Sequence, residues 1–289
     1  MFKGSMAALV TPYAAGEVDW KTLDALVDFH VAAGTDVLVP CGTTGESPTL
    51  THEENDAVVA AVVKRAKGKI PVLAGTGSNS TAEALQMTRN ARRNGADGSL
   101  LVVPYYNRPT QEGLYRHFKA VADAVDFPHV LYNIPGRCGV EMSVETICRL
   151  RADCPNIVAV KHATGSMDGA SELLSRCDIG VISGDDSMTL PLMSIGAVGV
   201  ISVLANIVPK DVKALTDAAL GGDWETARRW HFKTFRLAKG LLSIEVNPIP
   251  IKTAMAMRGL IQEEFRLPLC PMAPANREKL AAALKEYGI

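Results

Sequence analysis

The sequence lacks the signals typical of secreted, metal-binding or nucleic-acid-binding proteins. Its six cysteines include no C-x-x-C pair, which favours reduced thiols in a cytoplasmic protein over a disulfide framework. Its six histidines show no H-x-H or H-E-x-x-H spacing, so neither a metal nor another cofactor is expected. The formal net charge of −1 comes without a basic stripe, which argues against nucleic acid as a partner.

Membrane signals are also missing. The residues after Met6 form a strand-like run instead of the apolar region and cleavage site of a signal peptide. Residues 187–209 carry no charge, but Pro191, Gly196 and Gly199 interrupt them. A buried helix, a turn and a buried strand explain this stretch better than a span of about 20 residues. We therefore expect no membrane partner.

Eight short apolar runs alternate with amphipathic segments along the first 208 residues, and this pattern predicts the fold. The predicted strands are Met6–Val10, Asp36–Pro40, Ile70–Ala74, Ser99–Val103, His129–Tyr132, Ile157–Lys161, Ile179–Ser183 and Val198–Val203. Eight strand–helix units of roughly 25–30 residues match a (β/α)8 TIM barrel. An open doubly wound sheet is the alternative, but it would usually have fewer strands and a glycine-rich fingerprint after the first.

Helical periodicity fills the intervals between these strands and continues past the last one. Capping boxes are predicted at Thr51–Glu54 and at Ser80–Glu83. After Pro209 the pattern is purely helical, with predicted helices at 210–220, 223–242, 251–261 and 276–287. We therefore predict a barrel over residues 1–222 that carries the active site, and a helical C-terminal extension over residues 223–289.

The predicted sixth strand ends in a lysine, which is unusual for a buried apolar run. Lys161 follows Ile157-Val158-Ala159-Val160 at the point where the core meets the mouth of the barrel. Burial there disfavours the charged ammonium, and a neutral amine forms a Schiff base with a ketone. The structural alternative is a lysine that buries its stem and extends its amine to solvent.

Other reactive residue types also fall at strand ends, which converge on one mouth of a barrel. Thr43 and Thr44, between two glycines, are suited to hold a small anion. Tyr132 can shuttle protons and Arg137 can bind a carboxylate. Each of these residues, taken alone, can also be explained without catalysis. The threonine pair can belong to an ordinary turn, the tyrosine to the apolar core and the arginine to a solvated loop. Their convergence favours a catalytic site.

The predicted seventh strand leads into two aspartates, which narrows the substrate class. Phosphate sites of such barrels usually lie after strands seven and eight, where Asp185 and Asp186 would repel a phosphate. We expect these carboxylates to accept hydrogen bonds or cap a helix. A metal-free lysine enzyme that acts on unphosphorylated keto acids is the function that the residues favour.

Together these motifs resemble the dihydrodipicolinate synthase family. The resemblance is carried by Gly42-Thr43-Thr44-Gly45-Glu46, Tyr105-Tyr106-Asn107-Arg108-Pro109, Tyr132-Asn133-Ile134-Pro135 with Arg137, Lys161 with Ala163-Thr164-Gly165, Ser183-Gly184-Asp185-Asp186 and Asn247-Pro248-Ile249-Pro250. It runs from Phe2 to the C-terminal helices. It implies a barrel enzyme that condenses pyruvate with L-aspartate 4-semialdehyde to 4-hydroxy-tetrahydrodipicolinate, the first committed step of lysine and diaminopimelate biosynthesis. Homotetramers built as dimers of dimers are usual in this family.

The resemblance also implies roles for individual residues. Lys161 would form the imine with pyruvate, and Thr43 and Thr44 would hold the pyruvate carboxylate. Tyr132, Thr43 and Tyr106 would relay protons, with Tyr106 reaching in from the neighbouring subunit. The other substrate-binding positions implied are Arg137, which would bind the carboxylate of L-aspartate 4-semialdehyde, and the backbone of Gly184 and Ile201. The enamine would attack the aldehyde, and the amine of the product would then displace Lys161.

Two departures from the family pattern are visible. His162 stands where relatives usually have glutamate, and strand alternation predicts that it points away from Lys161. The positions matching the L-lysine effector site of many bacterial relatives are Ser47, Pro48, His52, Asn55, Asn79, Glu83 and Tyr105. Pro48 and Asn55 differ from the common alanine and histidine. Inhibition by L-lysine is therefore a hypothesis to be tested.

Three other functions are compatible with a buried lysine at a barrel mouth. N-acetylneuraminate lyases and 2-keto-3-deoxy sugar acid aldolases share the lysine and the tyrosine, but generally lack the arginine at position 137 and the paired tyrosines. A binding module that senses pyruvate or lysine would bind without turnover. A pyridoxal-phosphate barrel would need a loop that accepts phosphate.

Overall fold

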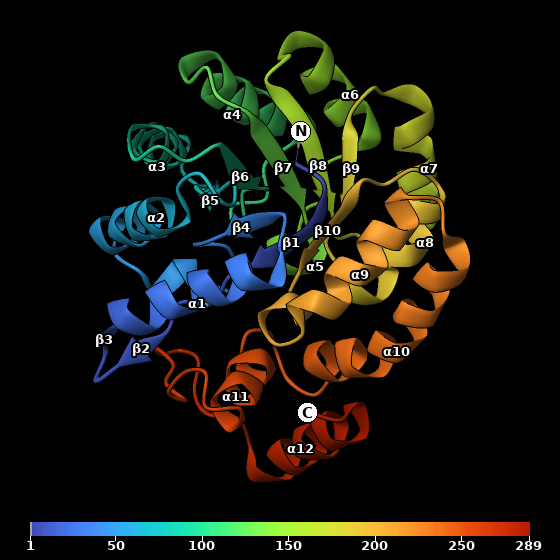
Figure 1. Cartoon of the computed structure of the whole chain (residues 1–289). Coiled ribbons are helices and arrows are strands. Elements are labelled where there is room, and N and C mark those ends of the chain that lie inside the picture. The colour runs from blue at the N-terminus through green and yellow to red at the C-terminus, as the bar shows by residue number, and fades with distance from the viewer. Residues whose placement is uncertain (1) are drawn as a thin grey trace.

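The computed structural model describes residues 2–289, and its centre is a closed barrel of eight parallel strands (Figure 1). The strands are β1 (Gly4–Ala8), β4 (Val37–Val39), β5 (Leu73–Gly75), β6 (Gly98–Val102), β7 (His129–Asn133), β8 (Ile157–His162), β9 (Gly180–Ser183) and β10 (Gly199–Ser202). Hydrogen bonds join them in the order β4-β1-β10-β9-β8-β7-β6-β5. A parallel bridge between Leu38 and Val72 connects the two ends of this order and closes the barrel. The predicted (β/α)8 fold is confirmed.

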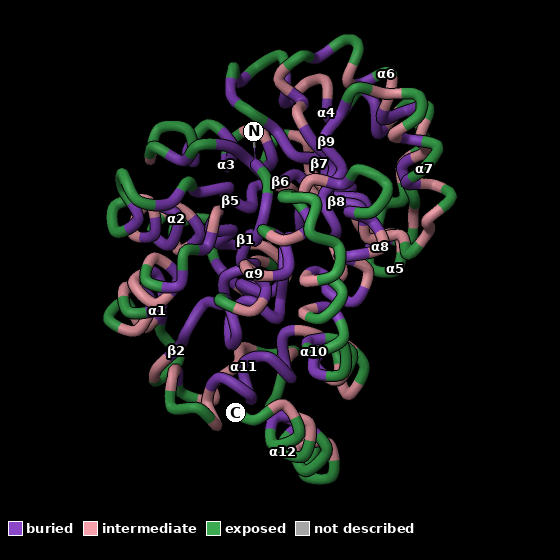
Figure 2. Tube along the Cα trace, turned by 45° about the vertical axis from the view of Figure 1, so that its right-hand side comes forward, coloured by how far each residue is buried: buried purple, intermediate pink, exposed green. Residues whose placement is uncertain are grey.

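Helices surround the barrel and cover its outer face. They are α1 (Trp20–Ala33), α2 (His52–Ala66), α3 (Thr81–Arg93), α4 (Gln111–Ala124), α6 (Val144–Asp153), α7 (Met167–Arg176), α8 (Thr189–Ser194) and α9 (Pro209–Leu220). Apolar strands are therefore buried on both faces, as parallel sheets require, and the exposed residues lie on the outer helices (Figure 2). None of the helices in residues 2–289 has both the length and the hydropathy needed to cross a membrane.

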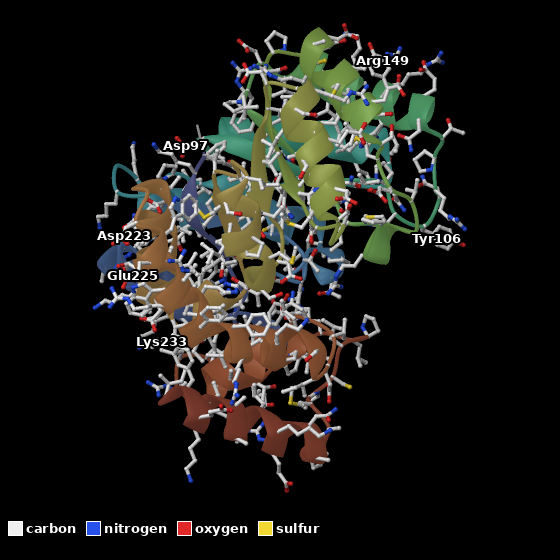
Figure 3. The ribbon with its side chains drawn as sticks, turned by 90° about the vertical axis from the view of Figure 1, so that its right-hand side faces the viewer. Asp97, Tyr106, Arg149, Asp223, Glu225 and Lys233 are labelled. Carbon is white, nitrogen blue, oxygen red and sulfur yellow. The ribbon has the colours of Figure 1, made fainter. Side chains whose placement is uncertain are left out.

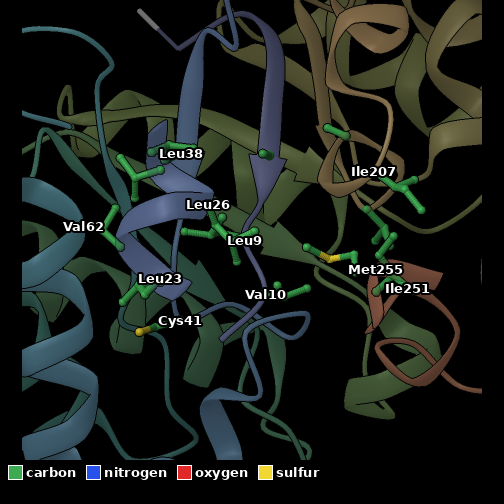
Figure 4. Packing of buried hydrophobic residues seen from close by; sticks show 14 of the residues in the cluster. Leu9, Val10, Leu23, Leu26, Leu38, Cys41, Val62, Ile207, Ile251 and Met255 are labelled. Carbon is green, nitrogen blue, oxygen red and sulfur yellow. The ribbon is translucent and has the colours of Figure 1, made fainter. Parts of the chain in front are cut away.

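Three helices follow the barrel: α10 (Trp224–Ser243), α11 (Ile249–Met257) and α12 (Pro274–Tyr287). Helix α10 packs on α9, and α12 packs on α10 and α11. The close view in Figure 4 shows how α11 joins the core, because its Ile251 and Met255 belong to the same buried cluster as Leu9 and Val10, which follow β1. The chain segment at the start of α11 is thereby held close to the end of β1.

The strand register decides which side chains share the barrel interior. Tyr132 on β7 is the direct partner of Lys161 on β8, and Lys161 is in turn the partner of Ile182 on β9. Tyr132, Ala159, Ile182 and other interior side chains form one buried apolar cluster. The lysine and the tyrosine therefore lie on adjacent strands at the same height.

Some local predictions were wrong. The short hairpin of β2 (Tyr13–Ala14) and β3 (Glu17–Val18), and the one-turn helix α5 (Pro135–Cys138), were not predicted. The helix predicted at 251–261 ends at Met257, because Gly259 adopts a left-handed conformation with φ 69°.

One of the two predicted capping boxes is complete. Thr51 and Glu54 cap α2 reciprocally. At α3, the Ser80 side chain accepts from the Glu83 N–H, but the Glu83 carboxylate accepts from the Ser78 hydroxyl at 2.7 Å. The Ser80 N–H donates to Ser78 Oγ instead, so the second half of this box does not form.

Candidate active site

Lys161 lies at the end of β8 and is almost fully buried. Its side chain nitrogen Nζ is 4.1 Å from the centre of the Tyr132 ring. Among residues 2–289, no carboxylate forms an ion pair with this amine. Lys161 instead lines a cavity of about 190 Å³, so the amine faces the space that a substrate would fill.

This cavity, which we call the mouth cavity, brings together most of the predicted site residues. Its polar lining comes from Thr43, Thr44, Tyr132, Arg137, Lys161, His162, Ser166, Asp185 and Asn247, with Gly165 and Gly184 beside them. Its apolar wall comes from Ile134, Ala163, Met188, Leu192, Val203 and Leu242. A lysine, a tyrosine, two threonines and an arginine therefore border one small space.

The turn that carries Thr43 and Thr44 is tightly constrained. It is flanked by two residues in the left-handed region, Cys41 at φ 56° and Glu46 at φ 55°. Gly45 cannot be replaced without displacement, because an added Cβ would lie 3.0 Å from the Cys41 nitrogen and 3.1 Å from the Leu9 oxygen. The threonine pair is thus held by backbone packing rather than by a regular element.

Asn247 is the main residue whose place in the site the sequence did not indicate. Its Nδ2 donates to Thr44 Oγ1 at 3.1 Å, and its backbone oxygen accepts from Arg137 Nη2 at 3.0 Å. Its buried Oδ1 has no hydrogen-bond partner within residues 2–289. The one available signal was the motif Asn247-Pro248-Ile249-Pro250, which does not by itself reveal these contacts.

Arg137 stands on the exposed helix α5 at the border of the mouth cavity. Within the described residues 2–289 it has no carboxylate partner, and its side chain donates a hydrogen bond only to the Asn247 carbonyl. Most N–H groups of its guanidinium therefore remain available to an anionic ligand, which they can bind in a two-pronged geometry.

His162 is buried next to Lys161 and bonds to its own loop. Its Nε2 lies 2.9 Å from the Ser166 oxygen and 2.9 Å from Thr164 Oγ1. The Thr164 hydroxyl also accepts from the Ser166 N–H at 3.1 Å. This histidine fixes the loop after β8, although it also contributes to the wall of the mouth cavity.

The loop after β9 forms another part of the wall of the mouth cavity. Gly184 packs so closely that an added Cβ would lie 2.6 Å from the Ala163 Cβ. Asp185 accepts from the Ser187 N–H, and Asp186 accepts from the N–H groups of Val203 and Leu204 at 3.0 Å each. Burial raises the pKa of Asp186. Both aspartates thus serve loop structure, in agreement with the hydrogen-bonding role predicted for them.

Two predicted residues lie outside the mouth cavity. The Ile201 side chain is buried in the apolar cluster inside the barrel. Tyr106 follows β6 at φ 72° and is 90% exposed, and Figure 3 shows it at the edge of the molecule, away from the barrel. A tyrosine in this position cannot reach the site of its own chain without a large movement of the loop.

A second cavity, of about 420 Å³, adjoins the site and collects most of the predicted effector residues. Ser47, Pro48, His52, Asn55, Glu83 and Tyr105 line it together with Thr43, Tyr132 and Arg137. Asn79 is absent from this lining, but its Nδ2 donates to the Tyr105 oxygen at 3.2 Å. In residues 2–289, no group of three His, Cys, Asp or Glu side chains is arranged to hold a metal ion.

Known proteins match this chain over its full length. The model of the dihydrodipicolinate synthetase family matches residues 1–287. A 4-hydroxy-tetrahydrodipicolinate synthase from Geotalea uraniireducens (strain Rf4) is 56% identical over 291 residues, which cover 100% of both chains. The crystal structure of dihydrodipicolinate synthase from Aquifex aeolicus superposes with a TM-score of 0.97 at 54% identity, over 99% of this chain and 98% of that one.

Two further similar structures hold ligands. The chloride-inhibited dihydrodipicolinate synthase from Acinetobacter baumannii, complexed with pyruvate, has a TM-score of 0.97 and 46% identity, and each chain is covered to 100%. The enzyme from Cyanidioschyzon merolae with lysine bound has a TM-score of 0.96 and 38% identity, with 99% of this chain and 98% of that chain covered.

Proposed function

The chain belongs to the dihydrodipicolinate synthetase family and is a 4-hydroxy-tetrahydrodipicolinate synthase, and from this premise we propose how its residues divide the work. The substrates are pyruvate and L-aspartate 4-semialdehyde, and the reaction passes through a Schiff base. The observation that carries this proposal is the Lys161 amine, 4.1 Å from the Tyr132 ring, in one cavity with the threonine pair and Arg137.

Pyruvate binds first, with its ketone at Lys161. The amine attacks the carbonyl carbon, and water leaves as the imine forms. Thr43 and Thr44 hold the carboxylate, since both residues line the cavity that Lys161 also lines. Loss of a proton from the methyl group then gives the enamine, with the electrons of the broken C–H bond forming the new double bond.

Tyr132 moves the protons that these steps require. Tyr132 lines the mouth cavity, and its ring centre lies 4.1 Å from the lysine amine. Thr43 lies on the same cavity wall and continues the relay. Tyr106 of a neighbouring subunit completes the relay.

The aldehyde substrate enters beside Arg137. The guanidinium binds its carboxylate. Gly184 lines the mouth cavity, whereas Ile201 lies outside it, in the apolar cluster inside the barrel. The enamine carbon attacks the aldehyde, and the amine of the adduct then displaces Lys161 and closes the ring, which regenerates the enzyme.

Comparison of acceptors tests this assignment against the sugar-acid aldolases. With pyruvate, we expect turnover of L-aspartate 4-semialdehyde and none of N-acetylmannosamine or glyceraldehyde in a coupled assay, because these two aldehydes have no carboxylate for Arg137 to bind. Arg137→Met should raise KM for the semialdehyde roughly 10- to 100-fold. The substitution removes hydrogen bonds to a charged group, and the binding free energy of such bonds corresponds to this factor. The pyruvate affinity of the variant should be unchanged. Turnover of the sugar aldehydes by the wild type would contradict the assignment.

We propose that L-lysine binds the second cavity as an effector. The cavity offers the Glu83 carboxylate for an ammonium group, and it shares Thr43, Tyr132 and Arg137 with the mouth cavity. Ser47, Pro48, His52, Asn55, Asn79 and Tyr105 complete the proposed site. A ligand there can act on the proton relay directly.

Millimolar L-lysine should therefore lower the initial rate. Glu83→Gln should abolish this inhibition without changing the uninhibited rate, because the amide loses the charge that attracts an ammonium but keeps an acceptor for Ser78. D-lysine is the control for stereospecific binding. A rate that stays flat as L-lysine rises would remove the effector site from the proposal.

We propose a homotetramer, built as a dimer of dimers. Large apolar side chains are exposed on α10 and just after α8, at Ile195, Trp224, Phe232 and Phe235. Helices α8 and α10 contact each other, so these side chains mark a surface that a second copy can cover. The exposed Tyr106 marks a different contact, where two active sites complete each other.

We also propose that the protein acts in the cytoplasm. Its six free cysteines fit the reducing conditions there.

Coexpression of two inactive chains tests whether Tyr106 acts in the neighbouring subunit. Tyr106→Phe chains keep Lys161 but lack the hydroxyl, and Lys161→Ala chains keep Tyr106. A mixed dimer then contains one site with both groups, so we expect activity to return in the mixture and in neither parent. A mixture as inactive as its parents, with mixed dimers confirmed by mass spectrometry, would place Tyr106 in its own chain's site.

A further inference from the structure

One ion pair of the chain is completely withdrawn from solvent and has no part in the proposed chemistry. Glu46 and Lys252 pair through Oε1 and Nζ, and both side chains are 0% exposed. Glu46 ends the turn that carries Thr43 and Thr44, whereas Lys252 lies on α11, 206 residues later in the chain. The pair therefore connects the pyruvate end of the site to the C-terminal helices.

The backbone conformation of Glu46 and its buried charge would each be unfavourable without the contacts that surround this residue. Its backbone lies in the left-handed region, at φ 55°, which non-glycine residues avoid. A buried carboxylate also loses its hydration and needs partners. Such a residue persists only where its surroundings determine its conformation. Here these surroundings are Lys252, the Arg266 N–H at 3.3 Å from Oε2, and the Thr43 oxygen, which accepts from the Glu46 N–H at 3.1 Å.

The Lys252 ammonium is enclosed as closely as the carboxylate. Its Nζ lies 4.3 Å from the centre of the Tyr13 ring and 5.1 Å from that of Phe265. Burial lowers the pKa of Lys252, and the Glu46 carboxylate opposes that shift. Arg266 adds a second ionic link, because it binds both oxygens of Glu54 at 2.6 Å and stacks 4.6 Å from the Tyr13 ring centre. The pair thus sits in a rigid, dry enclosure.

A second contact fastens the same turn to the same helix. Asn247, which precedes α11, donates to Thr44 Oγ1 at 3.1 Å. The turn is therefore attached at Thr44 and again at Glu46. The Thr44 hydroxyl is held directly by the bond from Asn247, and the backbone of the turn is held at Glu46.

We propose that the buried Glu46–Lys252 pair is a positioning device for the pyruvate carboxylate: it holds the Thr43–Thr44 turn against α11 in the geometry that the carboxylate requires. Neither residue touches substrate, so both are positioning residues and not catalytic ones. The proposal rests on the proposed function, since it assigns these two residues to the pyruvate half of that site. The proposal also gives α11 a function in the active site.

Borohydride trapping as a function of pyruvate concentration tests this inference, because it measures imine formation without the aldehyde. Lys252→Met leaves a buried carboxylate unpaired and should lower Tm and raise the half-saturating pyruvate concentration at least tenfold. Glu46→Gln with Lys252→Met removes both charges. It should recover most of the Tm, because a neutral buried site carries no unpaired charge. Its half-saturation should stay elevated, since the turn is no longer attached to Lys252.

Leu280→Ala is the matched control, because Leu280 is a buried side chain of α12, outside the turn, and its truncation opens a cavity. It should lower Tm and leave half-saturation at the wild-type value. Recovery of both Tm and half-saturation in the double variant would reduce the pair to a support of the fold and overturn the inference. A wild type that traps no pyruvate would instead overturn the proposed function.

Discussion

Lys161→Ala is expected to abolish turnover, with a loss of at least about 10³-fold, and to leave no pyruvate adduct after borohydride reduction. Lys161 is the one lysine among the residues that line the mouth cavity, and within residues 2–289 no carboxylate pairs with it. Intact-mass measurement after incubation with pyruvate and borohydride reads this out directly. In the wild type, peptide mapping should place the reduced adduct on Lys161.

The fold should survive this substitution. Lys161 makes no side-chain hydrogen bond with residues 2–289, and its removal leaves no partner group unpaired. Tm should therefore stay close to that of the wild type, so loss of activity cannot be ascribed to unfolding. Lys213→Ala is the control, because that lysine pairs with Asp36 and Asp217 on the outer surface. A pyruvate adduct on the Lys161→Ala protein would place the nucleophile elsewhere.

Tyr132→Phe is expected to lower kcat by roughly 10²- to 10⁴-fold, the usual contribution of a positioned proton-transfer group. The ring that lies 4.1 Å from the lysine amine is kept, and only the hydroxyl is removed. Imine formation should become slower but still reach completion, since the amine is intact. The slowed step is visible as a lower rate constant for pyruvate trapping at saturating pyruvate.

Tyr115→Phe provides the matched control for Tyr132→Phe. Its hydroxyl donates to Asp153 at 2.6 Å between α4 and α6, away from the mouth cavity. We expect a small loss of stability there and an unchanged kcat. Equal kcat values for Tyr132→Phe and the wild type would exclude the phenol from proton transfer and leave Thr43 as the candidate to replace it.

The fold and the position of Lys161 at a strand end could be predicted from the sequence because their signals are local. Apolar strands alternating with amphipathic helices require only near neighbours, and the order of the chain then dictates a parallel barrel. Lys161 was identifiable because it ends such a strand, and the Thr51–Glu54 capping box because its partners are three residues apart. The strand ends converge in any barrel, so the approach of Tyr132, Thr43 and Arg137 to Lys161 followed from the fold.

The contacts between the barrel and the C-terminal helices could not be predicted in this way. The Glu46–Lys252 pair joins residues 206 apart, and the Asn247–Thr44 bond joins residues 203 apart. A charged residue in a sequence indicates a solvated surface, because burial of a charge is rare unless a partner is present. Whether that partner exists depends on how distant segments pack once the barrel has closed. The sequence alone determined most strands and helices and the place of Lys161 at a strand end, whereas only the tertiary structure decided what holds the turn of Thr43 and Thr44 in place.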